Sequence, residues 1–422
     1  MSITNHKLFF VFSLIVFRAI LDFSYINSVS TIFEYEGFVL NFNIYNYLFS
    51  WIVYIFCTIL ISDYLNKISD YFFITFVIFL VAPITSLSGL DSERTIDVLM
   101  LTIFSLLIIY FIINTKTVNL VQMPYVKHGP SLVFFISILA SLILTLKILS
   151  SDITFNLDLE RVYEFRDENN LVFEGTLYSY LASWTYQIFN MFLIAFFLMK
   201  RNFFLVSFFI VFQIFFFSAL TQKEIIFFPA ILLFSWYFFR RTKSLLIFPV
   251  ACSFVLLLSM LIDQYYDINI FSGLFSRRLF FVPANLSYVY YEFFSFNNYA
   301  YWSNSFLKNI ITNDYPDGIP RAIAEYMGSL GSMNNGYISS GYAQAGLLGI
   351  IIYSILIGFI FKAANYFSFK QIPIWLSISI LFAPIRTLII SADLLTTLLT
   401  HGLILSLLVL FLARTNTGQK IE

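Results

Sequence analysis

The sequence predicts an all-α membrane protein, a polytopic bundle of about twelve transmembrane helices with two large extracytoplasmic loops. Its composition is 59% hydrophobic and only 11% charged, whereas soluble domains hold about 25% charged residues. Apolar stretches of roughly 20 residues, enough for a helix to cross a hydrocarbon core, recur along the whole chain. Because a bilayer offers no water to unpaired peptide groups, such continuous runs are expected to be helices. Residues 1–422 are therefore expected to form a single integral membrane domain.

The predicted spans follow one another with short connections over most of the chain. They cover residues 8–26, 42–61, 71–89, 96–114, 130–149, 176–199, 203–220, 224–239, 244–262, 341–361, 372–391 and 394–412. The first span is expected to be retained rather than cleaved, because it carries charges and ends without a small-residue cleavage pattern. The last two spans are separated so closely that residues 391–393 could instead lie within one broken helix.

Basic residues mark one side of the predicted bundle. If the N-terminus lies in the cytoplasm, the inner loops receive Lys200, Arg201 and the run 240–243, whereas acidic residues are few in them. Because short cytoplasmic loops hold an excess of Lys and Arg, we expect both termini in the cytoplasm. The opposite face then receives two long loops, residues 150–175 and 263–340, which hold most of the polar side chains.

The first outer loop mixes charges of both signs with aromatic residues between Asp158 and Asn170. Arg161 and Arg166 have planar donor groups that suit phosphate oxygens, and neighbouring carboxylates can accept a proton from a sugar hydroxyl. The same pattern also fits a solvated helix in which Arg161 pairs with Asp158 and Glu164, each three residues away. The spacing leaves both interpretations open.

The second outer loop contains twin arginines, Arg277 and Arg278, followed by an aromatic run at 288–294. This pattern predicts a helix that lies along the outer interface or dips into it, with its aromatic side chains buried. The arginines would either reach ordinary lipid phosphates or hold a lipid-linked pyrophosphate. The turn-rich segment that leads to Arg321 and Glu325 could line a cleft or form a mobile surface loop.

Three charged residues lie inside predicted spans, where they are costly unless they face the bundle interior, a wet cavity or each other. Arg18 and Asp22 are four residues apart and could pair on one helix. Arg386 has no near partner except Asp393, two turns on, and is the stronger candidate for lining a groove. His401, in the last span, is expected to be a satisfied interior histidine.

No cofactor or metal is expected. The histidines at positions 6, 128 and 401 are scattered, and Cys57 and Cys252 lie in separate apolar runs. The sequence has no phosphate-binding glycine loop, dinucleotide fingerprint or serine elbow. We therefore expect any reaction to draw its energy from an activated substrate in the membrane.

Three segments on the predicted outer side occur in the order Val162–Arg166, Arg277–Ala284 with Tyr290–Phe294, and Gly341–Gly349. Together with the plan of many spans and two outer loops, they resemble the Wzy-type oligosaccharide repeat-unit polymerases, or O-antigen polymerases. The likeness extends over most of the second half of the chain. Each segment is short, and it is their order and their side of the membrane that make the resemblance specific.

The resemblance implies a multi-pass glycosyltransferase of the bacterial inner membrane. It would join undecaprenyl-diphosphate-linked repeat units outside the cytoplasm, by moving the growing glycan onto a sugar hydroxyl of the next unit. Arg166, Arg277 and Arg278 look like the family's outer-loop arginines and would hold the donor pyrophosphate, with help from Arg386. The general base would be one of Glu160, Asp167, Glu168 and Glu325. Further substrate contacts are expected from Arg161, Tyr163, Tyr290, Tyr291, Arg321 and Glu325.

The implied partners are the lipid-linked donor and acceptor glycans, membrane lipids, a chain-length regulator and a flippase, with no nucleic acid. One rival function is an O-antigen ligase, which uses the same class of donor with a lipid A core acceptor. Another is a flippase for lipid-linked oligosaccharides, which would have short loops and place its charges at the bundle midplane. A purely structural partner in a polysaccharide assembly complex is the remaining alternative.

Overall fold

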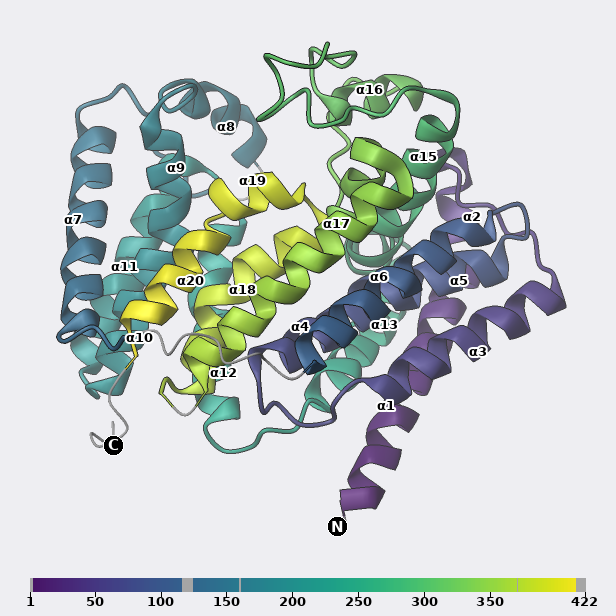
Figure 1. The fold of residues 1–422 in the computed structure, drawn as a ribbon, viewed down its shortest axis with the longest axis horizontal. Coiled ribbons are helices and arrows are strands. Elements are labelled where there is room, and N and C mark those ends of the chain that lie inside the picture. Colours follow the sequence, from purple (N-terminus) through teal and green to yellow (C-terminus); the bar gives the residue numbers. More distant parts are fainter. Residues whose placement is uncertain (1–2, 116–123, 159–160, 370, 415–422) are drawn as a thin grey trace.

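The computed structural model describes residues 3–115, 124–158, 161–369 and 371–414 as a bundle of helices (Figure 1). Helix accounts for 74% of the chain, and the described residues contain no strand. Within them, nine helical segments are long and apolar enough to cross a membrane, and three shorter apolar helices accompany these. The predicted fold class is confirmed, and each predicted span falls on one of these helices.

The spans differ in continuity. Those made of a single helix are α3 (Ile44–Leu60), α6 (Ile96–Asn114), α7 (Gly129–Leu149), α11 (Phe203–Leu220), α12 (Glu224–Phe239), α13 (Ile247–Tyr266) and α18 (Ile374–Ile390). Those that run through a wider π-helical segment are α1–η1–α2 (Ile3–Ser24, Tyr25–Val29, Ser30–Ile32), α4–η3–α5 (Ile68–Phe76, Val77–Val81, Ala82–Leu90) and α9–η4–α10 (Leu177–Trp184, Thr185–Phe189, Asn190–Met199). The broken spans are α17 (Tyr337–Ser368) and the pair α19 (Leu394–Leu399) and α20 (Leu403–Leu412).

The connections between spans gather at two ends of the bundle. One end, which we name the basic end, holds the start of α1, the end of α20 and the basic turns after α3, α10 and α12 (Figure 1). Contacts join these turns, since the Leu65 amide donates to the Lys243 carbonyl at 2.7 Å and His6 bonds to Ser244 at 3.0 Å. The opposite end, which we name the loop end, holds the described parts of residues 150–175 and 263–340.

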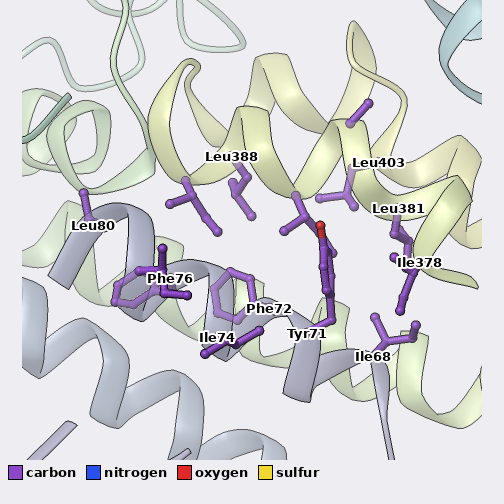
Figure 2. Packing of buried hydrophobic residues seen from close by; sticks show 14 of the residues in the cluster. Ile68, Tyr71, Phe72, Ile74, Phe76, Leu80, Ile378, Leu381, Leu388 and Leu403 are labelled. Atoms are coloured by element: carbon purple, nitrogen blue, oxygen red, sulfur yellow. The ribbon is translucent and has the colours of Figure 1, made fainter. Parts of the chain in front are cut away.

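The central spans are enclosed by other helices. The rod α4–η3–α5 is 94% buried over its most apolar stretch, whereas α7 and α13 are only 33% and 22% buried and so face lipid with most of their surface. Phe72 and Phe76 of the rod belong to the same buried cluster as Leu381 and Leu388 of α18, as Figure 2 shows. Helices α1, α3 and α13 pack on one side of this core, and α9 to α12 join α18 on the other.

A helical run dips into the bundle from the loop end without crossing it. It consists of α14 (Ile270–Ser272), η5 (Gly273–Phe281) and α15 (Val282–Phe296). At its start, the Asp263 carboxylate accepts the amides of Phe271 and Ser272 at 3.0 and 2.6 Å. Near its end, the Tyr291 hydroxyl donates to Asp97, which lies in the first turn of α6 at the loop end. The run therefore enters and leaves by the same end.

The first turns of α17 fold back on the rest of the helix. Ala345 and Gly346 leave helical geometry, and Gly346 adopts a φ of +59°, which favours glycine. A Cβ atom on Gly349 would lie 1.9 Å from the Gly341 carbonyl oxygen, so the two backbones touch. Further along both arms, Tyr337 and Ser354 both bond to the Ser105 hydroxyl. Residues 337–344 and 347–354 thus form an antiparallel helical hairpin.

The loop at residues 300–301 hydrogen-bonds to the backbone of α17 beside its break. The amides of Ala300 and Tyr301 donate to the carbonyls of Ala343 and Gln344, at 2.9 and 2.8 Å. These carbonyls have lost their helical partners at the break, and a buried carbonyl without a partner is costly. The loop therefore supplies the hydrogen bonds that the broken helix needs.

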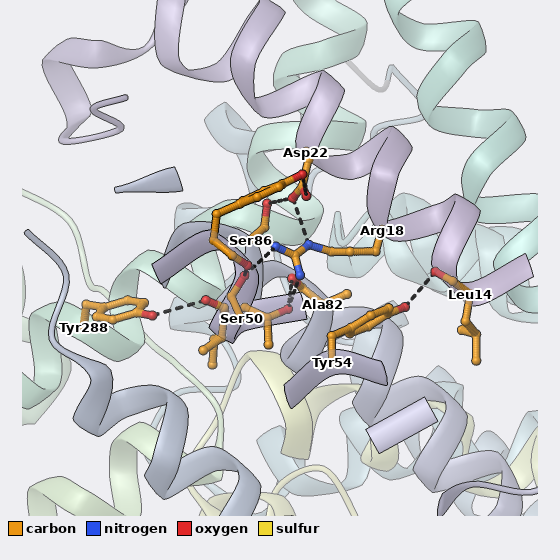
Figure 3. Close-up of polar contacts among 11 residues, drawn as sticks. Leu14, Arg18, Asp22, Ser50, Tyr54, Ala82, Ser86 and Tyr288 are labelled. Atoms are coloured by element: carbon orange, nitrogen blue, oxygen red, sulfur yellow. Dashed lines mark hydrogen bonds and ion pairs between the residues drawn. The ribbon is translucent and has the colours of Figure 1, made fainter. Parts of the chain in front are cut away.

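Arg18 and Asp22 form a buried ion pair in the first span, which confirms the pairing that their spacing predicts (Figure 3). The Arg18 side chain is fully buried, and its Nε donates to Asp22 at 2.8 Å. A second nitrogen donates to the Thr85 hydroxyl at 2.8 Å, and the Ser86 hydroxyl donates to Asp22. Because these contacts neutralise and hydrogen-bond both groups, the pair has a structural role.

We predict that Arg18→Met lowers the free energy of unfolding by about 3–5 kcal/mol, because it leaves the Asp22 carboxylate buried without its counter-charge. The double variant Arg18→Met/Asp22→Leu should recover most of this loss, since an apolar pair of similar volume is often neutral. Unfolding in detergent, followed for both variants and the parent, measures the effect. A double variant no more stable than Arg18→Met would contradict the assignment.

Candidate functional site

The short helix α19 creates the candidate site by interrupting the last span at the loop end. Asp393 ends the turn after α18 and caps α19, because its carboxylate accepts the Leu395 amide at 2.7 Å. Gly402 separates α19 from α20 with a φ of +69°, and a Cβ there would lie 2.5 Å from the Ile188 side chain. Polar side chains gather on two sides of α19, in the Asp393 pocket and the Arg386 cluster defined below.

The Asp393 pocket is a cavity of about 170 Å³ between the dipping run, the α17 hairpin and α19. Amides, hydroxyls and one carboxylate line it together with apolar side chains. The polar lining residues are Tyr290, Asn304, Ser305, Asn334, Asn335, Ser340, Gln344, Asp393 and Thr396, and the apolar ones are Ile319, Pro320, Ala392 and Leu395. Such a lining suits a ligand with many hydroxyl groups, because each hydroxyl both donates and accepts hydrogen bonds.

The Asp393 carboxylate is the only acidic side chain among the lining residues of this pocket. It accepts a hydrogen bond of 2.7 Å from the Tyr353 hydroxyl, which in turn accepts one of 3.0 Å from the Trp302 ring nitrogen. Asp393 lies in the turn between α18 and α19, outside both spans. Burial raises the pKa of its carboxyl above the usual range, although the bonds from Tyr353 and the Leu395 amide lower it in part. The group is therefore placed to take up a proton.

Asn335 brings an unused acceptor into the same pocket. Its side chain is 3% exposed, and its nitrogen donates to the Pro283 carbonyl at 2.9 Å and to the Ser339 hydroxyl at 2.8 Å. Its oxygen has no hydrogen-bond partner among the described residues. A buried amide oxygen without a partner costs free energy, so a bound donor group would be favourable here.

The Arg386 cluster lies on the other side of α19. We define it as Tyr186, Gln187, Gln222, Glu224, Arg386 and His401. Arg386 of α18 pairs with Glu224 of α12 at 2.5 Å, and Tyr186 donates to Gln222 at 2.6 Å and to Glu224 at 3.4 Å. The π-helical segment η4 presents Tyr186 and Gln187 in succession, and such segments are frequent at functional sites.

Several groups of the Arg386 cluster keep free hydrogen-bonding capacity. The Arg386 Nε, the Gln187 Oε1 and the His401 Nδ1 have no partner among the described residues. The Arg386 side chain is nevertheless 41% exposed, so a ligand can reach its remaining nitrogens. A guanidinium with free donors beside an open surface suits a phosphate oxygen.

The first outer loop packs beside this cluster. Asn169 on α8 (Val162–Leu171) donates to the Ala219 carbonyl at the end of α11, at 3.0 Å, and the Asn156 amide donates to Ser218 at 2.8 Å. Arg166 lies three residues before Asn169, on the same side of α8. The structure thus packs α8, the helix that carries Arg166, against the end of α11.

Two residues of the first loop follow the local pairing considered from the sequence. Arg161 donates to Glu164 at 2.8 Å, and both side chains are mostly exposed, at 58% and 61%. An exposed pair of this kind contributes little to stability. Glu160 lies outside the described residues, and the described part of α8 does not include the side chains of Tyr163, Asp167 and Glu168.

Arg277 and Arg278 lie elsewhere in the bundle. Arg277 pairs with Glu36 of η2 (Glu34–Glu36), and its guanidinium lies 4.4 Å from the centre of the Phe33 ring. Arg278 is exposed on the same run. These contacts place Arg277 beside the ends of α1 and α2, apart from the helices that hold Arg386, and Arg278 follows it on the same run. The arginines that the sequence analysis expects to hold the donor pyrophosphate therefore do not all lie together, since Arg277 and Arg386 are on different parts of the bundle.

The other predicted substrate residues take supporting positions. Tyr290 is buried in the wall of the Asp393 pocket and donates to the Met333 carbonyl at 2.8 Å, while Tyr291 bonds to Asp97. Arg321 on α16 (Ile319–Tyr326) pairs with Glu325 and donates to the Leu330 carbonyl. Arg321 and Glu325 thus shape the loop that leads into the pocket.

Sequence reasoning missed the partner of Arg386 and most of the Asp393 pocket. The only partner considered for Arg386 was Asp393, but the structure pairs it with Glu224, because residues 391–393 leave the helix and turn Asp393 toward Tyr353. The acidic residue in the short gap between two spans was a signal for Asp393. No comparable signal marks Asn335 or Gln344, since the break in α17 is what brings them together.

We predict that Asp393→Asn stabilises the fold at pH 7. The pKa of the Asp393 carboxyl is higher in the folded than in the unfolded protein, so the protonated carboxyl favours the folded state. This contribution to stability is complete at a pH below the pKa of the unfolded state, and it is lost as the pH rises through the pKa of the folded state. As the pH rises, the parent loses this contribution, whereas the uncharged Asn side chain does not titrate. The one Asn oxygen can accept either the Tyr353 hydroxyl or the Leu395 amide, which the two carboxylate oxygens accept separately in the parent. Thermal unfolding at pH 7 and pH 4 should show an advantage for Asp393→Asn that shrinks at the lower pH. An equal or lower midpoint at pH 7 would contradict this.

Comparisons with known proteins give no relative to set beside this site. No family model, curated protein or solved structure matches the chain. The candidate site is therefore argued from its geometry alone, with the Asp393 pocket on one side of α19 and the Arg386 cluster on the other.

Proposed function

We propose that this chain is an oligosaccharide repeat-unit polymerase that works at the loop end, on the extracytoplasmic side of a bacterial inner membrane. The observation that carries the proposal is the pair of polar sites on either side of α19. The Arg386 cluster offers a partly exposed guanidinium to an anion, and the Asp393 pocket offers acceptors to hydroxyl groups. Transfer of a glycan from a lipid diphosphate to a sugar hydroxyl needs both kinds of site, close together.

In the proposed reaction, a hydroxyl oxygen of the acceptor sugar bonds to the anomeric carbon of the donor glycan. The bond from that carbon to the carrier phosphate breaks, and its electron pair leaves with undecaprenyl diphosphate. Arg386 offsets the negative charge that grows on the leaving phosphate, and Arg166, on the helix that packs against the end of α11, is proposed to assist it. The proton of the acceptor hydroxyl passes to the Asp393 carboxylate, which holds a proton more readily than an exposed carboxylate because burial raises its pKa.

This proposal assigns the general base to a residue outside the set considered from the sequence. Asp393 lines a cavity that can hold a sugar, and Tyr353 fixes the orientation of its carboxylate. Glu325 is engaged with Arg321 in shaping a loop. Arg277 and Arg278 have no part in the chemical step, and from their place beside α1 and α2 they would contact lipid phosphates or the carrier lipid.

The orientation of the bundle supports an extracytoplasmic reaction. The basic end gathers turns rich in Lys and Arg, including Lys200, Arg201 and residues 240–243. Because such turns are enriched in the cytoplasm, the loop end would face outward, where lipid-linked repeat units are polymerised. A flippase would deliver these units, and a chain-length regulator would act on the same end.

The first test is deletion of the gene followed by gel analysis of the surface polysaccharide. We expect a lipid core that carries a single repeat unit, because units would still be made and attached but not joined. A core without any repeat unit would favour a ligase or a flippase instead. An unchanged ladder of chain lengths would contradict the proposal.

The second test replaces Arg386 by Gln in the same strain. We expect polymer formation to fall about 100–1,000-fold, because a donor to the developing phosphate charge is lost. Lys308→Gln, which removes an exposed cation of the second outer loop, serves as the matched control and should leave the ladder intact. A full ladder from Arg386→Gln at normal protein level would remove this residue from the mechanism.

A further inference from the structure

The basic end contains a cavity that has no part in the proposed reaction. It measures about 300 Å³ and lies between the ends of α10 and α12 and the start of α18. Its apolar wall includes Leu198, Phe239 and Trp375, while Arg201 and Arg240 stand at its edge. Phe239 and Trp375 are each 5% exposed, whereas both arginines are exposed. The cavity is therefore apolar inside and cationic at its rim.

Two of the neighbouring arginine side chains lie over aromatic rings. The Arg240 guanidinium lies 5.3 Å from the centre of the Trp236 ring, and that of Arg241 lies 3.8 Å from the centre of Tyr237. These four side chains line a second hollow of about 230 Å³, which shares Arg240 and Trp236 with the first. Stacking on a ring leaves the edge donors of a guanidinium available to another ligand.

The arginines of this region have no acidic partner among the described residues. Within the described part of the chain, none of the ion pairs involves Arg201, Arg240 or Arg241. Clustered like charges repel one another, and this cost is removed when an anion binds between them. A phosphate group meets this requirement, since several guanidinium donors can share its oxygens.

We propose that this cavity binds the headgroup of an anionic phospholipid. The helices end here, so the rim lies at the level where lipid phosphates meet water, and basic pockets between spans at this level bind such headgroups. Arg201 and Arg240 hold the phosphate, and the apolar wall with Trp236 accommodates the glycerol and the first carbons of the acyl chains. A soluble phosphate would gain nothing from this wall, which favours a lipid as the occupant.

This site is independent of the proposed polymerase activity, but it bears on the same helices. Helices α12 and α18 carry Glu224 and Arg386 at the loop end, and their opposite ends form the lipid cavity. A lipid that bridges the two helices at the basic end stabilises the folded bundle, because it binds only where both helix ends are in place.

The test uses the full-length protein, purified in a neutral detergent and supplied with mixed micelles of phosphatidylglycerol or phosphatidylcholine. We expect phosphatidylglycerol to raise the thermal unfolding midpoint by roughly 2–4 °C and phosphatidylcholine to raise it much less. In Arg201→Gln/Arg240→Gln, the apparent affinity for phosphatidylglycerol should fall about 30-fold, because two cations at the headgroup are lost. The matched control Lys127→Gln/Lys243→Gln removes two exposed cations of the same end and should keep the parent's affinity.

Three results would overturn the proposal. One is equal affinity in Arg201→Gln/Arg240→Gln and the parent, and another is an equal loss in the lysine control, which would indicate a diffuse charge effect. The third is an equal midpoint shift with inorganic phosphate alone, which would make the ligand a soluble anion. If the double variant does not fold, Arg201→Lys/Arg240→Lys keeps the charge but loses the planar donors. It should bind more weakly than the parent, and unchanged binding there would also contradict the proposal.

Discussion

The lack of water inside a bilayer is the constraint on which this structure depends. Every backbone group and every charge at membrane depth needs a partner within the protein. The Arg18–Asp22 pair meets this need with hydroxyl groups from neighbouring helices, and it does so inside a continuous span. Most spans pair their backbone hydrogen-bonding groups by remaining helical from end to end. These spans form the scaffold that holds the polar sites.

The breaks in α17 and around α19 lie beside the Asp393 pocket. The α17 hairpin and the turns on either side of α19 open at the loop end, and both border the Asp393 pocket. Their freed backbone groups are satisfied by the loop at residues 300–301 and by the Asp393 carboxylate. Broken helices at membrane depth are tolerated where they line a polar cavity, so the breaks themselves indicate the site.

The sequence predicts those features that are formed by residues close together along the chain. Continuous apolar runs locate the spans, and a spacing of four residues predicts the Arg18–Asp22 pair, because both signals lie within one helix. The partner of Arg386 lies 162 residues away along the chain, on another helix, and no spacing rule reaches it. In the same way, Asn335 and Asp393 meet only because two helices are broken, which hydropathy does not reveal.

The central claim is that the broken helices line a polar pocket that opens toward the outside of the cell. Thiol labelling tests it most directly. The native cysteines are replaced by Cys57→Ala and Cys252→Ala, and Thr396→Cys then places one thiol in the pocket wall, with Lys127→Cys as a marker of the basic end. We predict that a membrane-impermeant maleimide labels Thr396→Cys in intact spheroplasts and labels Lys127→Cys only in inside-out vesicles. Labelling of both from the same side, or of Thr396→Cys only after denaturation, would contradict the account.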